Sequence, residues 1–217
     1  METLIEVNGL SKDFGALRAV TDLSLKVYRG EVLGFLGPNG AGKSTTMKMI
    51  TGFLAPTSGS VSIAGFDIEK SPIEAKTRIG YLPEGAPAYG EMTPAGFLEF
   101  IADIRCIPRS QRDARITEVV SKIHLESVLH QRIETLSKGF KRRVGLAQAI
   151  LHDPEILIMD EPTDGLDPNQ KHEVRTLIQD MAADKAIVIS THILEEVDAV
   201  CTRAIIIGRG EIIFSGT

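Results

Sequence analysis

Short apolar runs separated by polar turns fill the first third of the chain. Leu23, Leu25 and Val27 alternate with polar residues, which predicts a strand with one buried face. Residues 32–36 are apolar almost throughout, as in a strand buried on both faces. Shorter runs predict further strands at residues 4–7, 61–63 and 78–82. This strand-rich opening favours an antiparallel layer of sheet.

From residue 86 the apolar positions recur every three or four residues, a period typical of amphipathic helices. Thr93 and Pro94 fit a helix N-terminus, because threonine caps the first turn and proline is tolerated at its first position. The helical period is carried by Phe97, Phe100, Ile101, Ile104, Ile116, Val119, Val120 and Ile123. We interpret residues 86–135 as a helical insertion, and we expect another long helix after Ser137.

The last third returns to strands that alternate with helices. Residues 155–161 and 186–190 are nearly continuous apolar runs, which are typical of the centre of a parallel sheet. Two apolar runs flank Gly208-Arg209-Gly210 and predict a hairpin. Helices are predicted at residues 168–184 and 193–200. Alternating strands and helices predict an α/β core built on a parallel sheet.

Composition narrows the classes of function. The 217 residues suffice for one domain with a full core and a small subdomain. A net charge of −5 without a long basic run argues against nucleic acid as a partner. The sequence shows neither a signal peptide nor an apolar run that could span a membrane. Cys106 and Cys201 have no metal-like spacing and suit a reducing cytoplasm, so we expect a cytoplasmic protein.

A phosphate-binding loop lies between a predicted strand and a predicted helix. Its pattern, G-x-x-x-x-G-K-[ST], spans residues 37–45: Gly37, Pro38, Asn39, Gly40, Ala41, Gly42, Lys43, Ser44 and Thr45. The glycines let backbone N–H groups point at an anion, and the following helix adds the positive end of its dipole. Lys43 supplies an ammonium for the terminal phosphates, and Ser44 a hydroxyl for Mg²⁺. A glycine-rich turn with a chance Lys-Ser pair is the alternative, and the flanking elements argue against it.

A second acidic element follows the apolar run at residues 155–161. Asp160 stands where phosphate-loop enzymes hold Mg²⁺, and Glu161 is a candidate base for the attacking water. An acidic strand end that only caps a turn is the alternative. The position of Asp160 and Glu161, after an apolar strand and downstream of the phosphate loop, favours the catalytic interpretation.

A third element points to a family. Leu136-Ser137-Lys138-Gly139-Phe140 resembles the signature sequence, usually LSGGQ, of ATP-binding-cassette (ABC) ATPases. The phosphate loop and residues 156–161 then correspond to the Walker A and Walker B motifs of that family. His192 matches the switch histidine of the family, and Phe14 occupies the place of the aromatic ring that stacks on adenine. The D-loop is represented by Gly165, Leu166 and Asp167.

The resemblance implies a fold and a domain organisation. The fold is that of an ABC cassette, an α/β P-loop NTPase with a RecA-like parallel-sheet core, an antiparallel β layer and an inserted helical subdomain. Residues 1–217 form a single ABC ATPase domain, in which residues 1–85 and 136–217 make the catalytic core and β layer. Residues 86–135 make the helical subdomain, which docks the membrane subunit near Pro87, Tyr89 and Met92.

The resemblance also implies cofactors, partners and a site shared between two chains. ATP and Mg²⁺ are the expected cofactors, with Ser44, Glu84 and Asp160 as the metal ligands. Lys43, Glu161 and His192 are the expected catalytic residues. Ser137, Lys138 and Gly139 serve the γ-phosphate of a second cassette in a head-to-tail pair, a homodimer or heterodimer closed by ATP. The expected function is ATP hydrolysis that powers a separate membrane permease, in the direction of export. The integral-membrane permease subunits hold the pair at the cytoplasmic, inner face of the cell membrane.

Two departures from the family pattern narrow the subfamily. Lys138 replaces the first signature glycine, and Phe140 replaces the glutamine. Glu84 stands where many cassettes have the glutamine of the Q-loop. This combination is similar to ABC-2 type, multidrug-like and gliding-motility exporter ATPases. Lys138 opposes the helix dipole, and our hypothesis is that a trisphosphate from the partner chain makes its charge favourable.

Other interpretations remain open. A non-transport ABC ATPase of DNA repair or translation, and a nucleotide-gated module with weak hydrolysis, share the same motifs. A small GTPase would require an NKxD motif, which is absent. Phe14 lies in a predicted turn at residues 11–15, where it could also be ordinary core. Residues 141–143 are interpreted as a solvated helix face, and His124, His130, His152 and His172 as surface or capping residues.

Overall fold

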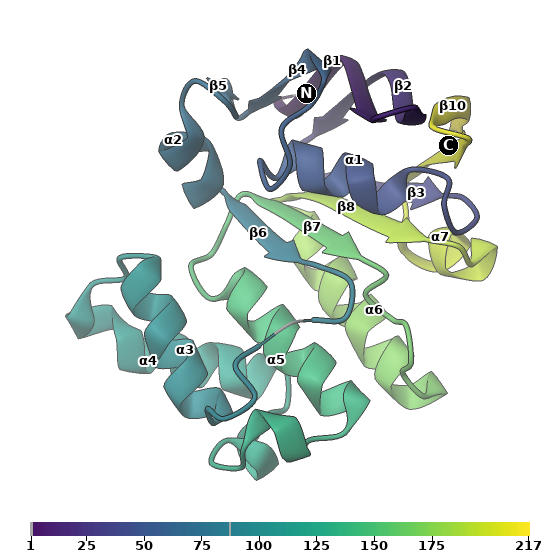
Figure 1. The fold of residues 1–217 in the computed structure, drawn as a ribbon. Coiled ribbons are helices and arrows are strands. Elements are labelled where there is room, and N and C mark those ends of the chain that lie inside the picture. The colour runs from purple at the N-terminus through teal and green to yellow at the C-terminus, as the bar shows by residue number, and fades with distance from the viewer. Residues whose placement is uncertain (1, 87) are drawn as a thin grey trace.

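The computed structural model describes residues 2–86 and 88–217, which form two sheets and a helical region (Figure 1). The antiparallel sheet has the order β2-β1-β4-β5. Its strands are β1 (Thr3–Phe14), β2 (Leu17–Tyr28), β4 (Ser58–Ile63) and β5 (Phe66–Asp67). This confirms the antiparallel layer expected from the strand-rich opening.

The turn predicted at residues 11–15 is wrong. Strand β1 continues through Phe14, which pairs with Leu17, so the turn is confined to Gly15 and Ala16. The ladder between β1 and β2 shifts register at several points, for instance between Lys12 and Asp13. Such irregularities let a strand continue through polar residues that lack clean alternation.

The second sheet is the parallel core that the apolar runs predict. Its order is β10-β9-β3-β8-β7-β6, with β10 antiparallel to β9 and the other pairs parallel. The strands are β3 (Val32–Leu36), β6 (Ile79–Leu82), β7 (Ile156–Asp160), β8 (Ala186–Thr191), β9 (Arg203–Gly208) and β10 (Glu211–Gly216). The predicted hairpin at residues 208–210 is the connection from β9 to β10.

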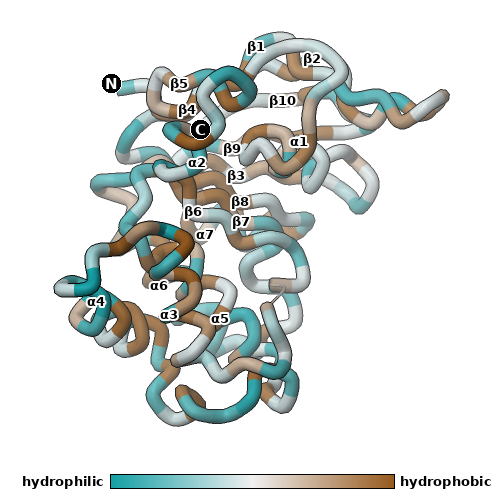
Figure 2. Tube along the Cα trace, turned by 60° about the vertical axis from the view of Figure 1, so that its left-hand side comes forward, coloured by the Kyte–Doolittle hydropathy of each residue, from teal (hydrophilic) through white to brown (hydrophobic). Residues whose placement is uncertain are grey.

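The central sheet separates two hydrophobic cores. On β7, Ile156 and Ile158 face the core shared with the antiparallel sheet, while Leu157 and Met159 face the helices below. Every residue of β7 and β8 is buried. A strand buried on both faces favours apolar side chains at successive positions, which explains why these runs do not alternate before their polar last residues. Figure 2 shows this concentration of hydrophobic residues in the central strands.

Helices cover both faces of the central sheet. Met47, Met49 and Ile50 of α1 belong to the core beneath the antiparallel sheet, whereas α3, α5 and α6 pack on the opposite face. The helices are α1 (Lys43–Ile50), α2 (Pro72–Thr77), α3 (Pro94–Ile104), α4 (Arg109–Lys122), α5 (Lys138–Ile150), α6 (Pro168–Ala182) and α7 (Leu194–Val200). Short 3₁₀ turns lie at Glu126–Val128 and Ile133–Thr135. Within the described residues, no helix is both long and apolar enough to cross a membrane.

The predicted helix starts hold. Thr93 caps α3, with its side-chain oxygen accepting a hydrogen bond from the Gly96 N–H at 3.2 Å. Ser137 caps α5 in the same way, accepting from the Phe140 N–H at 3.3 Å.

The interpretation of residues 141–143 as a solvated helix face is wrong for Arg142. Arg142 is only 6% exposed. It lies on the buried stripe of α5, three residues after Gly139 and four before Leu146, and both of these residues are buried. Helical neighbours at these spacings share one face, so the position of Arg142 on the stripe explains its burial.

Candidate functional site

The predicted site residues leave the carboxyl ends of four neighbouring strands. The phosphate loop follows β3, His192 follows β8, Glu161 follows β7, and Glu84 follows β6 by two residues. In the sheet these strands lie in the order β3-β8-β7-β6. Parallel strands end at the same edge of their sheet, which is where open α/β sheets place their ligands.

Two glycines of the phosphate loop have backbone angles that other residues avoid. Gly40 has φ 79° and Gly42 has φ 106°. A Cβ on Gly42 would also lie 2.7 Å from the backbone oxygen of Ala19. Gly37 has no positive φ, contrary to the expectation from the motif. It is required instead by packing, since a Cβ there would lie 2.4 Å from the backbone oxygen of Ile207.

The Lys43 ammonium lies over the phosphate loop and is almost buried, at 5% exposure. Its Nζ donates to the backbone oxygens of Gly37 at 2.7 Å and Pro38 at 3.2 Å. Glu161 Oε1 lies 3.6 Å from the same nitrogen. A buried lysine whose hydrogen-bond partners are two neutral carbonyls is suited to bind a phosphate, which offers it a negative charge.

Glu161 stands in a left-handed turn between strand β7 and the loop that follows. Its φ is 51°, a conformation that is uncommon outside glycine. The carboxylate joins the two other predicted catalytic residues, because Oε2 lies 3.0 Å from Nδ1 of His192 and Oε1 faces Lys43. The structure therefore brings Lys43, Glu161 and His192 together.

Asp160 is fully buried and leaves one carboxylate oxygen free. Oδ1 accepts a hydrogen bond from the Ser190 hydroxyl, whereas Oδ2 has no hydrogen-bond partner among the described residues. A buried carboxylate oxygen without a partner fits a cation, and carboxylate and hydroxyl oxygens are the ligands that Mg²⁺ prefers. No group of three His, Cys, Asp or Glu residues in the described chain could hold a metal alone. Mg²⁺ bound by one or two carboxylates and by phosphates needs no such group.

Ser190 is a site residue that the sequence reasoning missed. Besides the contact to Asp160, its backbone and side-chain oxygens accept from the Glu161 N–H at 3.1 and 3.2 Å. The sequence signal that could have identified Ser190 is its place at the end of an apolar strand. It pairs there with Asp160 at the end of the neighbouring parallel strand.

A cleft of about 520 Å³ opens in front of these groups. Phe14 lies at its rim with 48% of its surface exposed, so the alternative that Phe14 is core is wrong. The cleft is lined by Phe14, Leu17, Ala19, Asn39, Gly40, Gly42, Lys43, Ser44, Thr45, Glu84 and Glu161. It combines an exposed ring with phosphate-binding groups, as a nucleotide requires.

The signature residues lie elsewhere. Of Ser137, Lys138 and Gly139, none lines this cleft. Ser137 and Lys138 are exposed, and Gly139 is packed against the side chain of Gln170 in α6. The D-loop is close by: Asp167 caps α6 by accepting from the Gln170 N–H at 3.0 Å. The structure thus places the signature beside the D-loop and α6, and neither lines the cleft of the phosphate loop.

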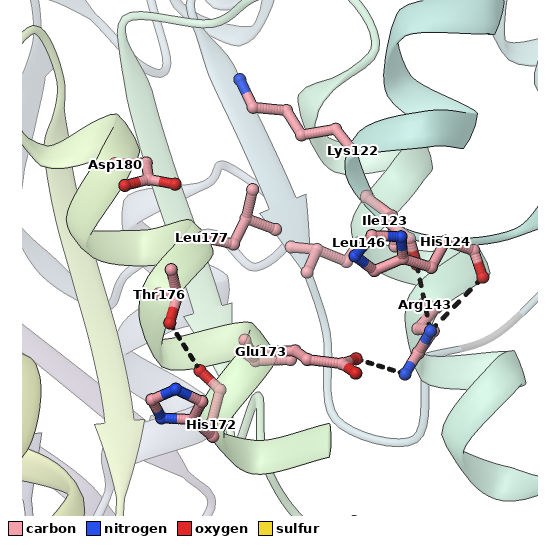
Figure 3. A pocket seen from close by; sticks show the side chains of 11 residues that line it. Lys122, Ile123, His124, Arg143, Leu146, His172, Glu173, Thr176, Leu177 and Asp180 are labelled. Carbon is pink, nitrogen blue, oxygen red and sulfur yellow. Dashed lines mark hydrogen bonds and ion pairs between the residues drawn. The ribbon is translucent and has the colours of Figure 1, made fainter. Parts of the chain in front are cut away.

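A second, smaller cleft of about 220 Å³ lies between α6 and the end of α4 (Figure 3). Arg143 crosses it, donating to the backbone oxygens of Ile123 and His124 and pairing with Glu173. His124 and His172 line it and are exposed, as predicted. His152, interpreted as a surface or capping residue, is half-buried, and burial lowers its pKa to about 4.

Comparison with known proteins agrees with this geometry. Residues 20–164 match the family described as "ABC transporter". The ABC transporter ATP-binding protein NatA of Bacillus subtilis is 39% identical over 92% of this chain and 82% of its own length. The linearmycin resistance ATP-binding protein LnrL of the same organism is 36% identical over 99% of this chain and 69% of its own length.

A solved structure described as the ATP-binding subunit of an ABC transporter has the same fold. It superposes with a TM-score of 0.91 at 32% identity, covering 99% of this chain and 90% of its own. The family match, the sequence relatives and the shared fold therefore agree. The chain belongs to the ABC transporter family, as one of its ATP-binding, ATP-hydrolysing subunits.

Proposed function

We propose that the chain binds Mg²⁺·ATP in the cleft beside Phe14 and hydrolyses it as one half of a head-to-tail pair that drives a membrane permease, in the direction of export. The observation that carries this proposal is the separation of Ser137, exposed at the start of α5, from the phosphate loop. A helix N-terminus with a free face attracts phosphate, and this one has no phosphate loop of its own chain beside it. A second cassette supplies one.

The cleft residues divide the binding of ATP among them. Phe14 stacks on the base, the N–H groups of the phosphate loop surround the β- and γ-phosphates, and Lys43 neutralises their charge. Ser44, Asp160 and Glu84 are the groups that would hold Mg²⁺, which neutralises charge on the transferred phosphoryl group when it is bound. The unpartnered Asp160 Oδ2 supports this assignment.

Glu161 acts as the general base. Its carboxylate accepts a proton from water, the water oxygen attacks the γ-phosphorus, and the bond to the leaving ADP oxygen breaks. His192, 3.0 Å from Glu161 Oε2, orients that carboxylate and contacts the γ-phosphate. The signature residues of the partner chain stabilise the same phosphate. Loss of the γ-phosphate therefore removes the contacts that bridge the two chains, and the pair opens.

An apolar groove supports a permease as the partner. Phe53, Ile73 and Ile104 are 78%, 75% and 57% exposed, and all three line one groove between the core and the helical region. Exposed apolar residues that gather on one surface mark interaction sites. We assign this groove, together with Tyr89 and Met92 at the start of residues 86–135, to a cytoplasmic segment of an integral-membrane subunit. Pro87 lies outside the described residues.

Export is the proposed direction, since the departures at Glu84 and Lys138 are similar to those of exporter ATPases. The relative LnrL is described as a linearmycin resistance protein, and expulsion of a toxic compound is one route to resistance. In this proposal residues 1–85 and 136–217 are the catalytic part, and residues 86–135 transmit its movement to the permease.

The proposal is tested by replacing Glu161 with Gln, which keeps the size of the side chain and removes the base. We expect Glu161→Gln to lower the rate of ATP hydrolysis by about 10²- to 10⁴-fold, and to leave the Kd for ATP within about threefold. The matched control is Glu99→Gln, an exposed glutamate of α3.

The same variant separates a motor from a nucleotide-gated module. With Mg²⁺ and ATP, Glu161→Gln should accumulate as a dimer in analytical ultracentrifugation, because unhydrolysed trisphosphate holds the two halves together. Equal turnover in Glu161→Gln and in Glu99→Gln would contradict the assignment of Glu161. A monomer at saturating ATP would contradict the shared site.

A further inference from the structure

A buried arginine contacts the turn that carries Glu161. Arg142 Nη2 donates to the backbone oxygens of Asp160, at 2.6 Å, and of Glu161. Its Nε donates to the Pro162 oxygen at 3.1 Å. The guanidinium therefore binds three successive carbonyls of the turn. Within the described residues, none of the hydrogen bonds of this guanidinium goes to the phosphate loop.

The surroundings keep this guanidinium both buried and charged. Burial lowers the pKa of Arg142, and the negative charges of Asp164, Asp160, Glu161 and Glu84 oppose that shift. An arginine stays protonated throughout the range in which proteins are studied. A buried cation with carbonyl acceptors on several sides fixes those carbonyls in place, since displacing them would leave the charge without partners.

The turn is held on its other side by β8. The Glu161 N–H donates to the backbone oxygen of Ser190 at 3.1 Å, while the Glu161 oxygen accepts from Arg142. Glu161 itself has φ 51°, a conformation that persists where its surroundings enforce it. Arg142 and Ser190 together supply that enforcement.

The same guanidinium reaches a third segment. Arg142 Nη1 donates to the Pro83 oxygen at 3.3 Å, immediately before Glu84. The side chain thus joins α5, whose N-terminus is the signature, to the Asp160–Pro162 turn and to the loop that carries Glu84. Arg143, the next residue, points instead into the separate cleft between α4 and α6 (Figure 3).

We propose that Arg142 is a positioning residue for ATP hydrolysis: it holds the backbone of the Asp160–Pro162 turn so that the Glu161 carboxylate stays beside His192 and Lys43. It also couples that turn to the loop at Pro83 and Glu84. This inference rests on the proposed role of Glu161 as the base. It assigns to α5 a function within its own chain, in addition to the presentation of the signature.

The test compares two methionine variants of similar shape. Arg142→Met removes the contacts to the turn, whereas Arg115→Met removes an arginine that donates to the backbone oxygens of Leu151 and Ile150, at the other end of α5. We expect Arg142→Met to lower kcat by about 10- to 100-fold and to leave the Kd for ATP within about threefold. Arg115→Met should keep kcat within about twofold. Arg142→Lys should recover part of the lost rate, because an ammonium donates to some of the carbonyls.

A double-mutant cycle separates positioning from a general loss of stability. In the Glu161→Gln background, Arg142→Met should change the residual rate by less than about twofold, since the group that it positions is already gone. An unchanged kcat in Arg142→Met would overturn the inference. The inference would also be overturned if Arg142→Met lowered kcat by the same factor in the parent chain and in Glu161→Gln. The same holds if Arg115→Met, at an equal melting temperature, lowered kcat as much as Arg142→Met does. Full turnover in Glu161→Gln alone would instead refute the role of Glu161.

Discussion

Cys106 and Cys201 are the same side chain in two environments. Cys106 is exposed after α3, whereas Cys201 is half-buried at the end of α7. A Cβ on Gly34 of strand β3 would lie 2.8 Å from the Cys201 sulfur, which shows how closely β3 and Cys201 pack. Burial raises the pKa of the Cys201 thiol to about 12, and the negative charge of Glu196 acts in the same direction. Thiolate, not thiol, is the nucleophile, so the two residues must differ in reactivity.

Iodoacetamide at pH 8 should therefore alkylate Cys106 and leave Cys201 almost unlabelled. With its pKa near 12, about one Cys201 thiol in 10⁴ is ionised at that pH, and this fraction rises as the pH approaches the pKa. Peptide mass spectrometry on the folded protein measures both sites. Cys106→Ser is the control and should take up almost no label. Equal labelling of the two cysteines would contradict the packing of Cys201 against β3.

Helices α3 and α5 both begin with a hydroxyl N-cap, but only the cap of α5 belongs to the signature. Thr93 caps α3 and Ser137 caps α5, each through a hydroxyl that accepts from an N–H three residues on. The two caps should contribute similar stability. Only Ser137 belongs to the signature, so only its hydroxyl should matter for hydrolysis.

Thr93→Ala and Ser137→Ala should each lower the free energy of unfolding by about 1 kcal/mol, the usual value of a helix cap. Urea denaturation measures this loss. ATP turnover should stay near the parent rate in Thr93→Ala and fall by about tenfold or more in Ser137→Ala. If both variants lost turnover in proportion to stability, the hydroxyl of Ser137 would be a cap and nothing else.

The elements that the sequence predicts well are those whose chemistry demands a contiguous pattern. The phosphate loop needs its glycines and Lys43 in fixed order, and the buried strands β7 and β8 need unbroken apolar runs. Arg142 shows the limit. Its charge within Lys141-Arg142-Arg143 suggested a solvated face, and only its spacing from Gly139 and Leu146 indicated burial. The pattern also fails to predict that β1 reaches Phe14, because the polar residues before it give no strand period. Helix α2, six residues long, was not predicted, since it is too short to show a helical period.

At the scale of the whole molecule, the proposed function places the two halves of a reaction centre on different surfaces of one chain. The cleft with Lys43 and the exposed Ser137 belong to separate regions of the structure. In a head-to-tail pair with C₂ symmetry, each centre takes its phosphate loop from one chain and its signature from the other. Defects in different halves should therefore complement each other.

Lys43→Met and Ser137→Arg should each be inactive alone and should regain activity when mixed. A mixed pair holds one intact centre, formed by the phosphate loop of one variant and the signature of the other. Random pairing of equal amounts predicts about a quarter of the parent rate. Steady-state ATPase measurements across mixing ratios check this value, with a mixture of Lys43→Met and Lys43→Met/Ser137→Arg as the inactive control. A mixture no more active than its components would show that each chain works by itself.

The four strands β3, β8, β7 and β6 determine where a label can be attached to follow the association of two cassettes. Hydrogen bonding holds neighbouring strands about 4.8 Å apart, so the sheet itself fixes how far the reacting groups stand from one another. The opposite edge, where Ala183 and Asp184 are exposed before β8, carries none of them. A fluorophore attached at that edge would report how two cassettes approach and part, while leaving the spacing of the hydrolytic groups unaltered.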